Sequence, residues 1–120
     1  MNSEVKKLWL DALRSGEYVQ AYGRLKADKG FCPLGVLCDI AIKNKIGELK
    51  WDCGSIASGD TISTTRSCKR IMGTLPEEVQ KWSGIDSVGT FPGKNSNVVK
   101  ANDSYKYTFE QLADMIEVYL

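Results

Sequence analysis

The residue type with the most direct chemical potential is a cysteine, Cys32, which stands immediately before Pro33 and a long apolar run. Proline suits the first position of a helix, so we expect Cys32 at the amino-terminal end of one. There the helix dipole and unpaired N–H groups would lower the thiol pKa and favour the nucleophilic thiolate. A cysteine hydrolase also needs a base to accept and return the proton, and the chain contains no histidine. A thiol enzyme using Cys32 therefore stays an alternative, and packing as a small apolar side chain is favoured.

The spacing of the cysteines does not favour a metal or redox centre. Four cysteines occur at positions 32, 38, 53 and 68, in the pattern C-x5-C-x14-C-x14-C. Zinc sites usually contain a close C-x-x-C pair or histidines, and thioredoxin-type redox sites need C-x-x-C. A redox pair of Cys32 and Cys38 stays open, but we expect no metal, no cofactor and no disulfide in a chain without an export signal.

Carboxylate chemistry is not indicated either. Asp39 is the one acidic residue inside an apolar stretch, and a buried carboxylate would need partners to offset its desolvation. Because buried aspartates are rare, we expect Asp39 at the solvated edge of its helix. The other acidic residues form no pair that the sequence singles out, so acid–base catalysis has no support and we do not expect an enzyme.

Basic and aromatic residues offer a better candidate site, for an anionic ligand with an aromatic ring. Arginine forks suit phosphate, and tyrosine rings suit a nucleobase. Two clusters have this composition, the alternating face Tyr18, Tyr22, Arg24 and Lys26 and the run Arg66, Lys69 and Arg70. Tyr105, beside Asn102 and Asp103, is a further candidate, whereas Trp82 lies on an apolar helical stripe and is expected in the core. The two clusters could equally be solvated surface, and no glycine-rich phosphate loop is present.

The first half of the chain must position these residues with two helices and a strand. Apolar residues recur at helical spacing before a Ser15-Gly16 stop, with Ser3 as the expected N-cap: Val5, Leu8, Trp9, Ala12 and Leu13. From residue 17 to 26 the period changes to two, which predicts one extended strand with Tyr18, Gln20, Tyr22, Arg24 and Lys26 on a shared face. The apolar run behind Pro33 predicts a buried central helix.

The second half is expected to contain a hairpin or an irregular excursion, then two helices and a short strand. Residues 47–70 are rich in glycine, serine and threonine, with strand-like pieces at 49–51 and 61–65. Thr74 followed by Glu77 has the form of a capping box for a short helix that ends at Gly84, and residues 84–97 read as a surface loop. A strand at 98–101 and a turn at Asn102-Asp103 should precede a last helix, capped by Thr108.

Length and composition fit one soluble α+β domain spanning residues 1–120, with four helices and a small antiparallel sheet. The 120 residues are 42% hydrophobic and 26% charged, with 16 basic against 15 acidic residues and a net charge of +1. This balance disfavours a nucleic-acid partner. No apolar run is long enough to span a bilayer, and the start of the chain lacks the form of a signal peptide, so we expect a cytoplasmic protein without a membrane partner.

Several motifs resemble a group of small phage and prophage proteins. The similar segments cover most of the chain except about residues 45–70 and 86–100: Ala12-Leu13-Arg14-Ser15-Gly16-x-Tyr18-x-Gln20, Gly23-Arg24-Leu25, Phe31-Cys32-x-Leu34-Gly35-Val36-Leu37-Cys38-Asp39, Leu75-Pro76-x-x-Val79-x-x-Trp82-x-Gly84, Asn102-Asp103 and Phe109-x-x-Leu112-Ala113-Asp114-x-Ile116-Glu117. Where the group commonly has Cys-Cys, this chain has Cys32-Pro33, which weakens any role for vicinal thiols. By analogy, the resemblance implies a counter-defence protein that sequesters a nucleotide-derived immune signal of the host.

The leading hypothesis is accordingly a non-enzymatic phage-type protein in the host cytosol that binds a small nucleotide-like ligand. The expected ligand contacts are Tyr22, Arg24, Asn102, Asp103 and Tyr105, with Arg66 and Arg70 as further candidates. The alternatives are a protein–protein inhibitor of a host enzyme and the thiol enzyme centred on Cys32. Sequestering proteins are often symmetric oligomers, so a homo-oligomer is compatible with this hypothesis.

Overall fold

In the part of the chain that the structure describes, a central helix is flanked by four other helices and a small sheet. The computed structural model describes residues 1–27, 30–47, 49–53, 60–64 and 73–120. The described helices are α1 (Ser3–Arg14), α2 (Pro33–Lys43), α3 (Glu77–Ser83), α4 (Val98–Asp103) and α5 (Phe109–Tyr119). The strands are β1 (Val19–Gln20), β2 (Lys26–Ala27), β3 (Gly30–Phe31), β4 (Leu49–Cys53) and β5 (Asp60–Thr64). The mixed α+β class is confirmed.

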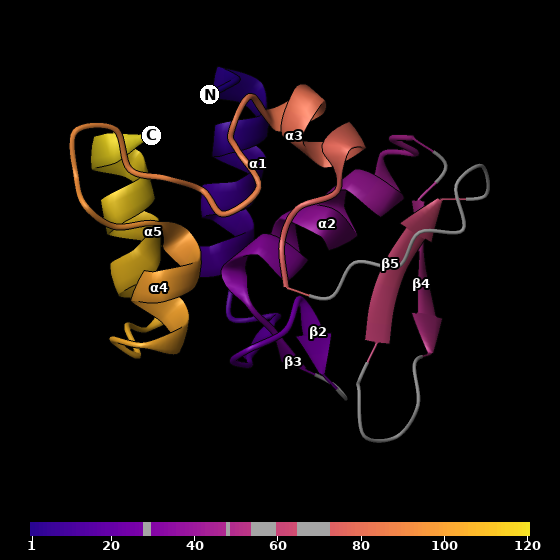
Figure 1. The fold of residues 1–120 in the computed structure, drawn as a ribbon, viewed down its shortest axis with the longest axis horizontal. Coiled ribbons are helices and arrows are strands. Elements are labelled where there is room, and N and C mark those ends of the chain that lie inside the picture. Colours follow the sequence, from indigo (N-terminus) through magenta and orange to yellow (C-terminus); the bar gives the residue numbers. More distant parts are fainter. Residues whose placement is uncertain (28–29, 48, 54–59, 65–72) are drawn as a thin grey trace.

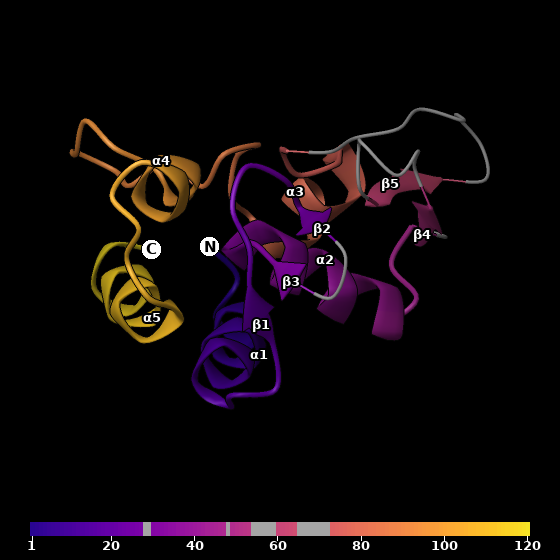
Figure 2. The same ribbon diagram turned by 90° about the horizontal axis from the view of Figure 1, so that it is seen from below.

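The sheet has the strand order β1-β3-β2-β5-β4. Its last two strands form an antiparallel hairpin with Leu49 opposite Thr64 and Cys53 opposite Asp60. In Figure 1 and Figure 2 this hairpin lies at the opposite end of the molecule from α4 and α5, with α2 between them. β1 and β3 run parallel, so the expectation of a purely antiparallel sheet was wrong.

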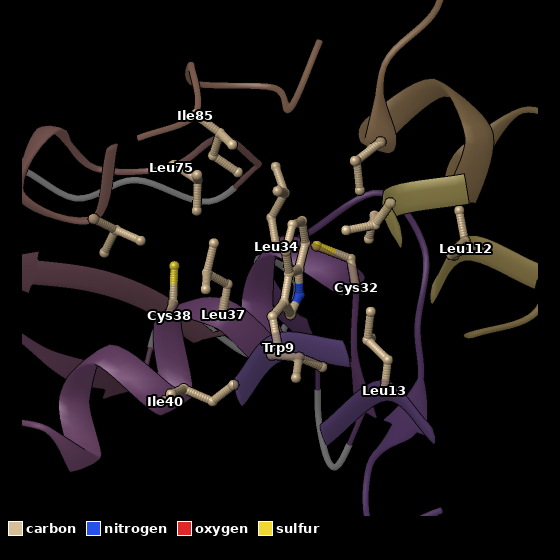
Figure 3. Packing of buried hydrophobic residues seen from close by; sticks show 14 of the residues in the cluster. Trp9, Leu13, Cys32, Leu34, Leu37, Cys38, Ile40, Leu75, Ile85 and Leu112 are labelled. Carbon is tan, nitrogen blue, oxygen red and sulfur yellow. The ribbon is translucent and has the colours of Figure 1, made fainter. Parts of the chain in front are cut away.

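α2 forms the middle of the hydrophobic core, as its apolar sequence predicts. Pro33 stands at its first position, and Trp9 of α1 donates its indole N–H to the Pro33 carbonyl at 2.8 Å. Figure 3 shows the Trp9 ring beside Leu34, with Cys32 close by and Leu37 farther along α2. α1 packs against both α2 and α5, so the core extends from α2 through α1 to the last helix.

Gly35 lets α2 pack directly on the backbone of Leu25. A Cβ atom at residue 35 would collide with the Leu25 carbonyl oxygen, which also accepts a hydrogen bond from the Cys32 N–H at 3.1 Å. Leu25 itself is fully buried. The segment before β2 is thus fixed against the amino-terminal end of α2.

The single long strand expected over residues 17–26 was wrong. Only Val19–Gln20 and Lys26–Ala27 are strands, and Gly23 turns the chain between them at φ +80°. Tyr18, Tyr22 and Lys26 therefore do not share the face of one strand. The turn instead carries Tyr22 toward the carboxyl-terminal half of the chain.

The strand expected over residues 98–101 was also wrong, because these residues begin α4. Asn97 caps this helix by accepting a hydrogen bond from the Lys100 N–H at 2.8 Å. Two successive β-branched valines had indicated a strand, but a cap and burial against the core override that local preference. The number of described helices is consequently five rather than four.

The helix caps were predicted with mixed success. Thr108 forms the expected capping box of α5, and Gly84 ends α3 in the left-handed conformation at φ 78°. The N-cap of α1 is Asn2 rather than Ser3. α3 starts behind Pro76 without a side-chain cap, so the capping box expected from Thr74 was wrong.

Candidate functional site

Asn102 is the buried centre of a polar network at the carboxyl end of α4. Its Oδ1 accepts from Gln20 Nε2 at 2.7 Å, and its Nδ2 donates to the Ala21 carbonyl at 3.0 Å and to Asp103 Oδ1 at 2.8 Å. The side chain is fully buried. Asn102 therefore joins α4 to the segment behind β1, and these bonds leave little capacity for direct recognition of a ligand.

Asp103 continues this network to the surface. The same Oδ1 atom accepts a hydrogen bond from the Gly23 N–H at 2.9 Å, which fixes the turn behind Tyr22. Asp103 itself is half-buried. Gln20 adds a second tie by donating from Nε2 to the Tyr107 carbonyl at 2.7 Å. Segments about eighty residues apart are held together in this way.

Three exposed tyrosines surround this network, and with two lysines they form what we name the tyrosine surface: Tyr22, Tyr105, Tyr107, Lys100 and Lys106. The Tyr105 and Tyr107 rings lie 5.8 Å apart, centroid to centroid. Lys106 places its ammonium 4.0 Å from the Tyr22 ring centroid, and the Lys100 ammonium lies 5.7 Å from that of Tyr105. The three rings are 43%, 52% and 36% exposed. The structure thus brings the predicted residues Tyr22, Asn102, Asp103 and Tyr105 together.

Lys106 has an uncommon backbone conformation within this surface. Its φ of 56° lies in the left-handed region, which costs a non-glycine residue about 1–2 kcal/mol. Hydrogen bonds on either side hold it there, from the Tyr105 N–H to the Lys100 carbonyl and from the Tyr107 N–H to the Ala101 carbonyl, both at 3.2 Å. Such strained positions concentrate at binding sites, where the fold over-determines them.

Of the three predicted arginines, Arg24 alone lies among the described residues. Arg24 follows the Gly23 turn, is half-buried and has its Nη1 atom enclosed. Arg66 and Arg70 lie outside the described residues, and the contribution of their cluster to a site therefore stays a prediction.

Asp39 is not at a solvated edge but in a hydrogen-bonded cluster, which corrects the expectation from sequence. Its Oδ2 accepts from the Tyr18 hydroxyl at 2.7 Å and lies 3.2 Å from the Lys43 ammonium, and its Oδ1 accepts from Trp51 Nε1 at 3.1 Å. Partial burial alone would raise the pKa of Asp39, but the hydrogen bonds from these three donors outweigh it and hold the pKa below its usual value. The carboxylate is therefore ionised and fully engaged.

Lys43 stands four residues after Asp39, at the spacing of a helical ion pair, but no local sequence signal could have found the other two partners. Tyr18 and Trp51 stand 21 and 12 residues away from Asp39 in the chain. The only hint was an acidic residue in an apolar helix, which must find partners wherever it is buried.

Cys32 occupies the predicted helix terminus but not the predicted electrostatic state. Burial raises the pKa of its thiol to about 12, and the hydrogen bond that the Gly35 N–H donates to its Sγ at 3.4 Å only partly offsets this. The expected lowering of the thiol pKa was wrong because desolvation exceeds the effect of the helix terminus. Cys32 is a neutral core residue at neutral pH.

The described part of the chain contains two free cysteine thiols and no cluster of metal-ligating side chains. Within residues 1–27, 30–47, 49–53, 60–64 and 73–120, no three cysteine or carboxylate side chains gather as metal ligands. Cys32 and Cys38 are free thiols, whereas the side chains of Cys53 and Cys68 fall outside this part. None of the described helices has the length and apolar character required to cross a bilayer.

A separate cavity of about 320 Å³ lies at the other end of α5, away from the tyrosine surface. The first and last residues, Met1 and Leu120, line it together with Asp86 and Thr90. None of the predicted ligand contacts among the described residues lines it.

The geometry defines a small α+β protein with an exposed aromatic and cationic surface. Over residues 1–120 the chain matches the family described as a domain of unknown function (DUF8296), and it belongs to this family. No curated protein and no solved structure matches the chain.

Proposed function

We propose that this protein binds a small nucleotide-derived ligand at the tyrosine surface without transforming it. In the phage setting that the sequence motifs imply, such capture would withdraw an immune signal from the host. The observation that carries the proposal is the convergence of three exposed tyrosines and two ring-bound lysines from separate segments of the chain.

The rings supply a surface on which a nucleobase can stack. Stacking of a base on an aromatic side chain is worth about 1–3 kcal/mol and tolerates any base. Tyr105, the most exposed ring, is the main candidate for this contact, with Tyr107 beside it. Two neighbouring rings also suit a ligand with more than one base.

The lysines supply positive charge beside the rings. Lys100 and Lys106 hold their ammonium groups at the Tyr105 and Tyr22 rings, respectively. A phosphate that approaches the same surface would meet both cations within reach of a stacked base. This arrangement favours an anionic aromatic ligand over a neutral one.

The buried network beneath the surface supports binding because it fixes the geometry in advance. Asn102 and Asp103 anchor the turn that carries Tyr22 to the helix that precedes Tyr105. Pre-organisation reduces the entropy lost on binding. Cys32 cannot supply a nucleophile in this setting, because its thiol is buried and neutral.

The test is a thermal-shift panel of nucleotides, cyclic oligonucleotides and ADP-ribose derivatives, followed by heat release and identification of the retained compound. Ligand at 100 times its Kd should stabilise the protein by about 2.7 kcal/mol, which is a rise in Tm of about 10 °C for a chain of this size. Recovery of the unaltered compound is expected. Recovery of a chemically altered compound would contradict binding without transformation of the ligand.

Tyr105→Ala should lower the affinity of the selected ligand about tenfold or more, by removal of one stacking contact. The matched control is Tyr119→Ala, because Tyr119 also carries a lysine over its ring, with the Lys94 ammonium 5.0 Å from the centroid. Tyr119 ends α5, about 15 Å along the helix from its start. Equal losses in both variants would contradict the assignment to the tyrosine surface.

A second candidate function is inhibition of a host enzyme by direct contact. Its specific support is the exposure of Tyr22, Tyr105 and Tyr107, because tyrosine is enriched in the centres of protein interfaces. Pull-down from host extract with the wild type and with Tyr105→Ala separates the candidates. Inhibition would be favoured by a stoichiometric protein partner that the wild type retains and Tyr105→Ala does not, together with no change in Tm across the ligand panel.

A further inference from the structure

A second aromatic group, which shares no residue with the tyrosine surface, joins the segment before β1 to β3 and β4. We name Tyr18, Phe31 and Trp51 the aromatic cage. Tyr18 and Phe31 meet edge to face, with centroids 5.0 Å apart and an interplanar angle of 89°. Phe31 and Trp51 follow at 6.0 Å and 67°. Successive rings therefore stand at steep angles, as walls rather than as a stack.

The cage holds a positive charge supplied by the chain itself. The Lys26 ammonium lies 5.5 Å from the centroid of Phe31 and 5.5 Å from that of Trp51. A cation within about 6 Å of a ring centroid is attracted by the ring quadrupole, most strongly at tryptophan. Lys26 is the one described lysine placed against two rings at once. It acts as an internal probe, which shows that this position accepts an ammonium group.

Asp39 fixes two of the three walls of the cage. Its carboxylate accepts hydrogen bonds from the Tyr18 hydroxyl and from the Trp51 indole N–H, at 2.7 Å and 3.1 Å. These bonds hold both rings in orientation. The Asp39 carboxylate is also ion-paired with the Lys43 ammonium, 3.2 Å from its Oδ2 atom, so its contribution to the cage is the orientation of the two rings rather than a net negative charge.

A methylated ammonium would suit this position better than the lysine that occupies it. A primary ammonium is strongly hydrated and loses that hydration between aromatic walls. A quaternary ammonium is weakly hydrated and is the cation that aromatic cages typically recognise. The flexible four-carbon stem of Lys26 allows its ammonium to leave the cage when such a group enters.

We propose that the aromatic cage of Tyr18, Phe31 and Trp51 is a binding site for the quaternary ammonium group of a small ligand, with the Lys26 ammonium as its internal competitor. This site is independent of the tyrosine surface and of the function proposed for it. Asp39 is a positioning residue, because it orients two walls of the cage through its hydrogen bonds.

The test is a titration of the folded protein with choline, followed by NMR at the Trp51 indole N–H resonance. The signal is identified by its loss in Trp51→Phe. Choline should shift this resonance saturably in the wild type and leave the indole signal of the buried Trp9 unchanged. The neutral isostere 3,3-dimethylbutanol has the same shape without the charge and should bind at least about tenfold more weakly.

Variants of the competitor and of the cage give opposite expectations. Lys26→Ala should tighten choline binding about fivefold, because it removes the internal cation. Lys26→Gln keeps the stem and serves the same purpose if the alanine variant does not fold. Phe31→Leu should abolish the shift while it preserves apolar volume. Lys94→Ala, which removes a lysine from the single Tyr119 ring, is the matched control and should leave the affinity unchanged.

The proposal is overturned by equal affinity for choline and its neutral isostere, since binding would then be only apolar. It is also overturned if choline saturates Lys26→Ala but not the wild type, because the cage would then be closed in the natural chain. Absence of a saturable shift in both proteins has the same meaning. None of these results depends on whether the tyrosine surface binds a nucleotide.

Discussion

Replacement of Asn102 by alanine should be among the most destabilising changes of a polar residue in this chain. The side chain is fully buried and makes three hydrogen bonds, to Gln20, Ala21 and Asp103. Each contributes about 1 kcal/mol net, and buried partners left unsatisfied add to the loss. We therefore expect the free energy of unfolding to fall by about 3–4 kcal/mol, which lowers Tm by about 12–15 °C for a domain of this size.

Urea denaturation followed by circular dichroism measures this loss directly, with Asn95→Ala as the control. Asn95 is exposed in the loop before α4, and its replacement should change stability by no more than about 0.5 kcal/mol. A double-mutant cycle with Gln20→Ala isolates the 2.7 Å bond and should give a coupling energy of about 1 kcal/mol. A loss below about 1 kcal/mol for Asn102→Ala, or no coupling to Gln20, would refute the role of this network as the link between α4 and the sheet.

Three further predictions test the packing and the ionised groups. Gly35→Ala should lower the free energy of unfolding by about 3 kcal/mol or more, because its Cβ meets the Leu25 carbonyl. The control Gly93→Ala places its Cβ in open space and should cost only about 1 kcal/mol, from the positive φ of residue 93. Equal losses of the two variants in denaturation curves would contradict this packing. Cys32 in the folded protein should resist alkylation by iodoacetamide at pH 7, because a thiol pKa of about 12 leaves a thiolate fraction on the order of 1 in 100,000. Mass spectrometry that maps the labelled site measures this rate. Labelling of Cys32 as fast as in an unfolded control would contradict the raised pKa. Because the pKa of Asp39 is lowered in the folded protein, its carboxylate stabilises the fold above the ordinary pKa near 3.8 and loses this contribution as the pH falls through the lower folded value. Asp39→Asn should therefore flatten the acid side of the profile of stability against pH. An unchanged acid slope in pH-dependent denaturation would show that the hydrogen bonds of Asp39 do not depend on its charge.

Local sequence signals determined the elements that depend on neighbours in the chain. The apolar spacing of α1, the proline that opens α2 and the capping box of α5 are interactions within about one helical turn. Glycine at residue 84 ends α3 for the same kind of reason, since it adopts a positive φ without steric cost. The strand pieces of β4 and β5 were also readable, because both are bounded by turn-forming residues.

Only the tertiary structure decided which of two local preferences prevailed. Val98 and Val99 favour a strand in isolation, yet the Asn97 cap and burial of Val98 make this segment helical. For Cys32, the helix terminus favours a thiolate, but enclosure in the core raises its pKa because a buried charge has lost its hydration.

The sequence named Tyr22 and Tyr105 of the tyrosine surface, and Asn102 and Asp103 of the network beneath it, but not the reason why they lie together. That reason is the contact of Gln20, Ala21 and Gly23 with Asn102 and Asp103. Tyr18 and Trp51 were hidden as partners of Asp39 for the same reason, because hydrogen bonds between segments that are distant in the chain follow from packing and leave no periodic trace in the sequence. The sequence by itself determined the helices α1, α2, α3 and α5, whereas packing decided that residues 98–103 are helical and which polar and aromatic side chains share a surface.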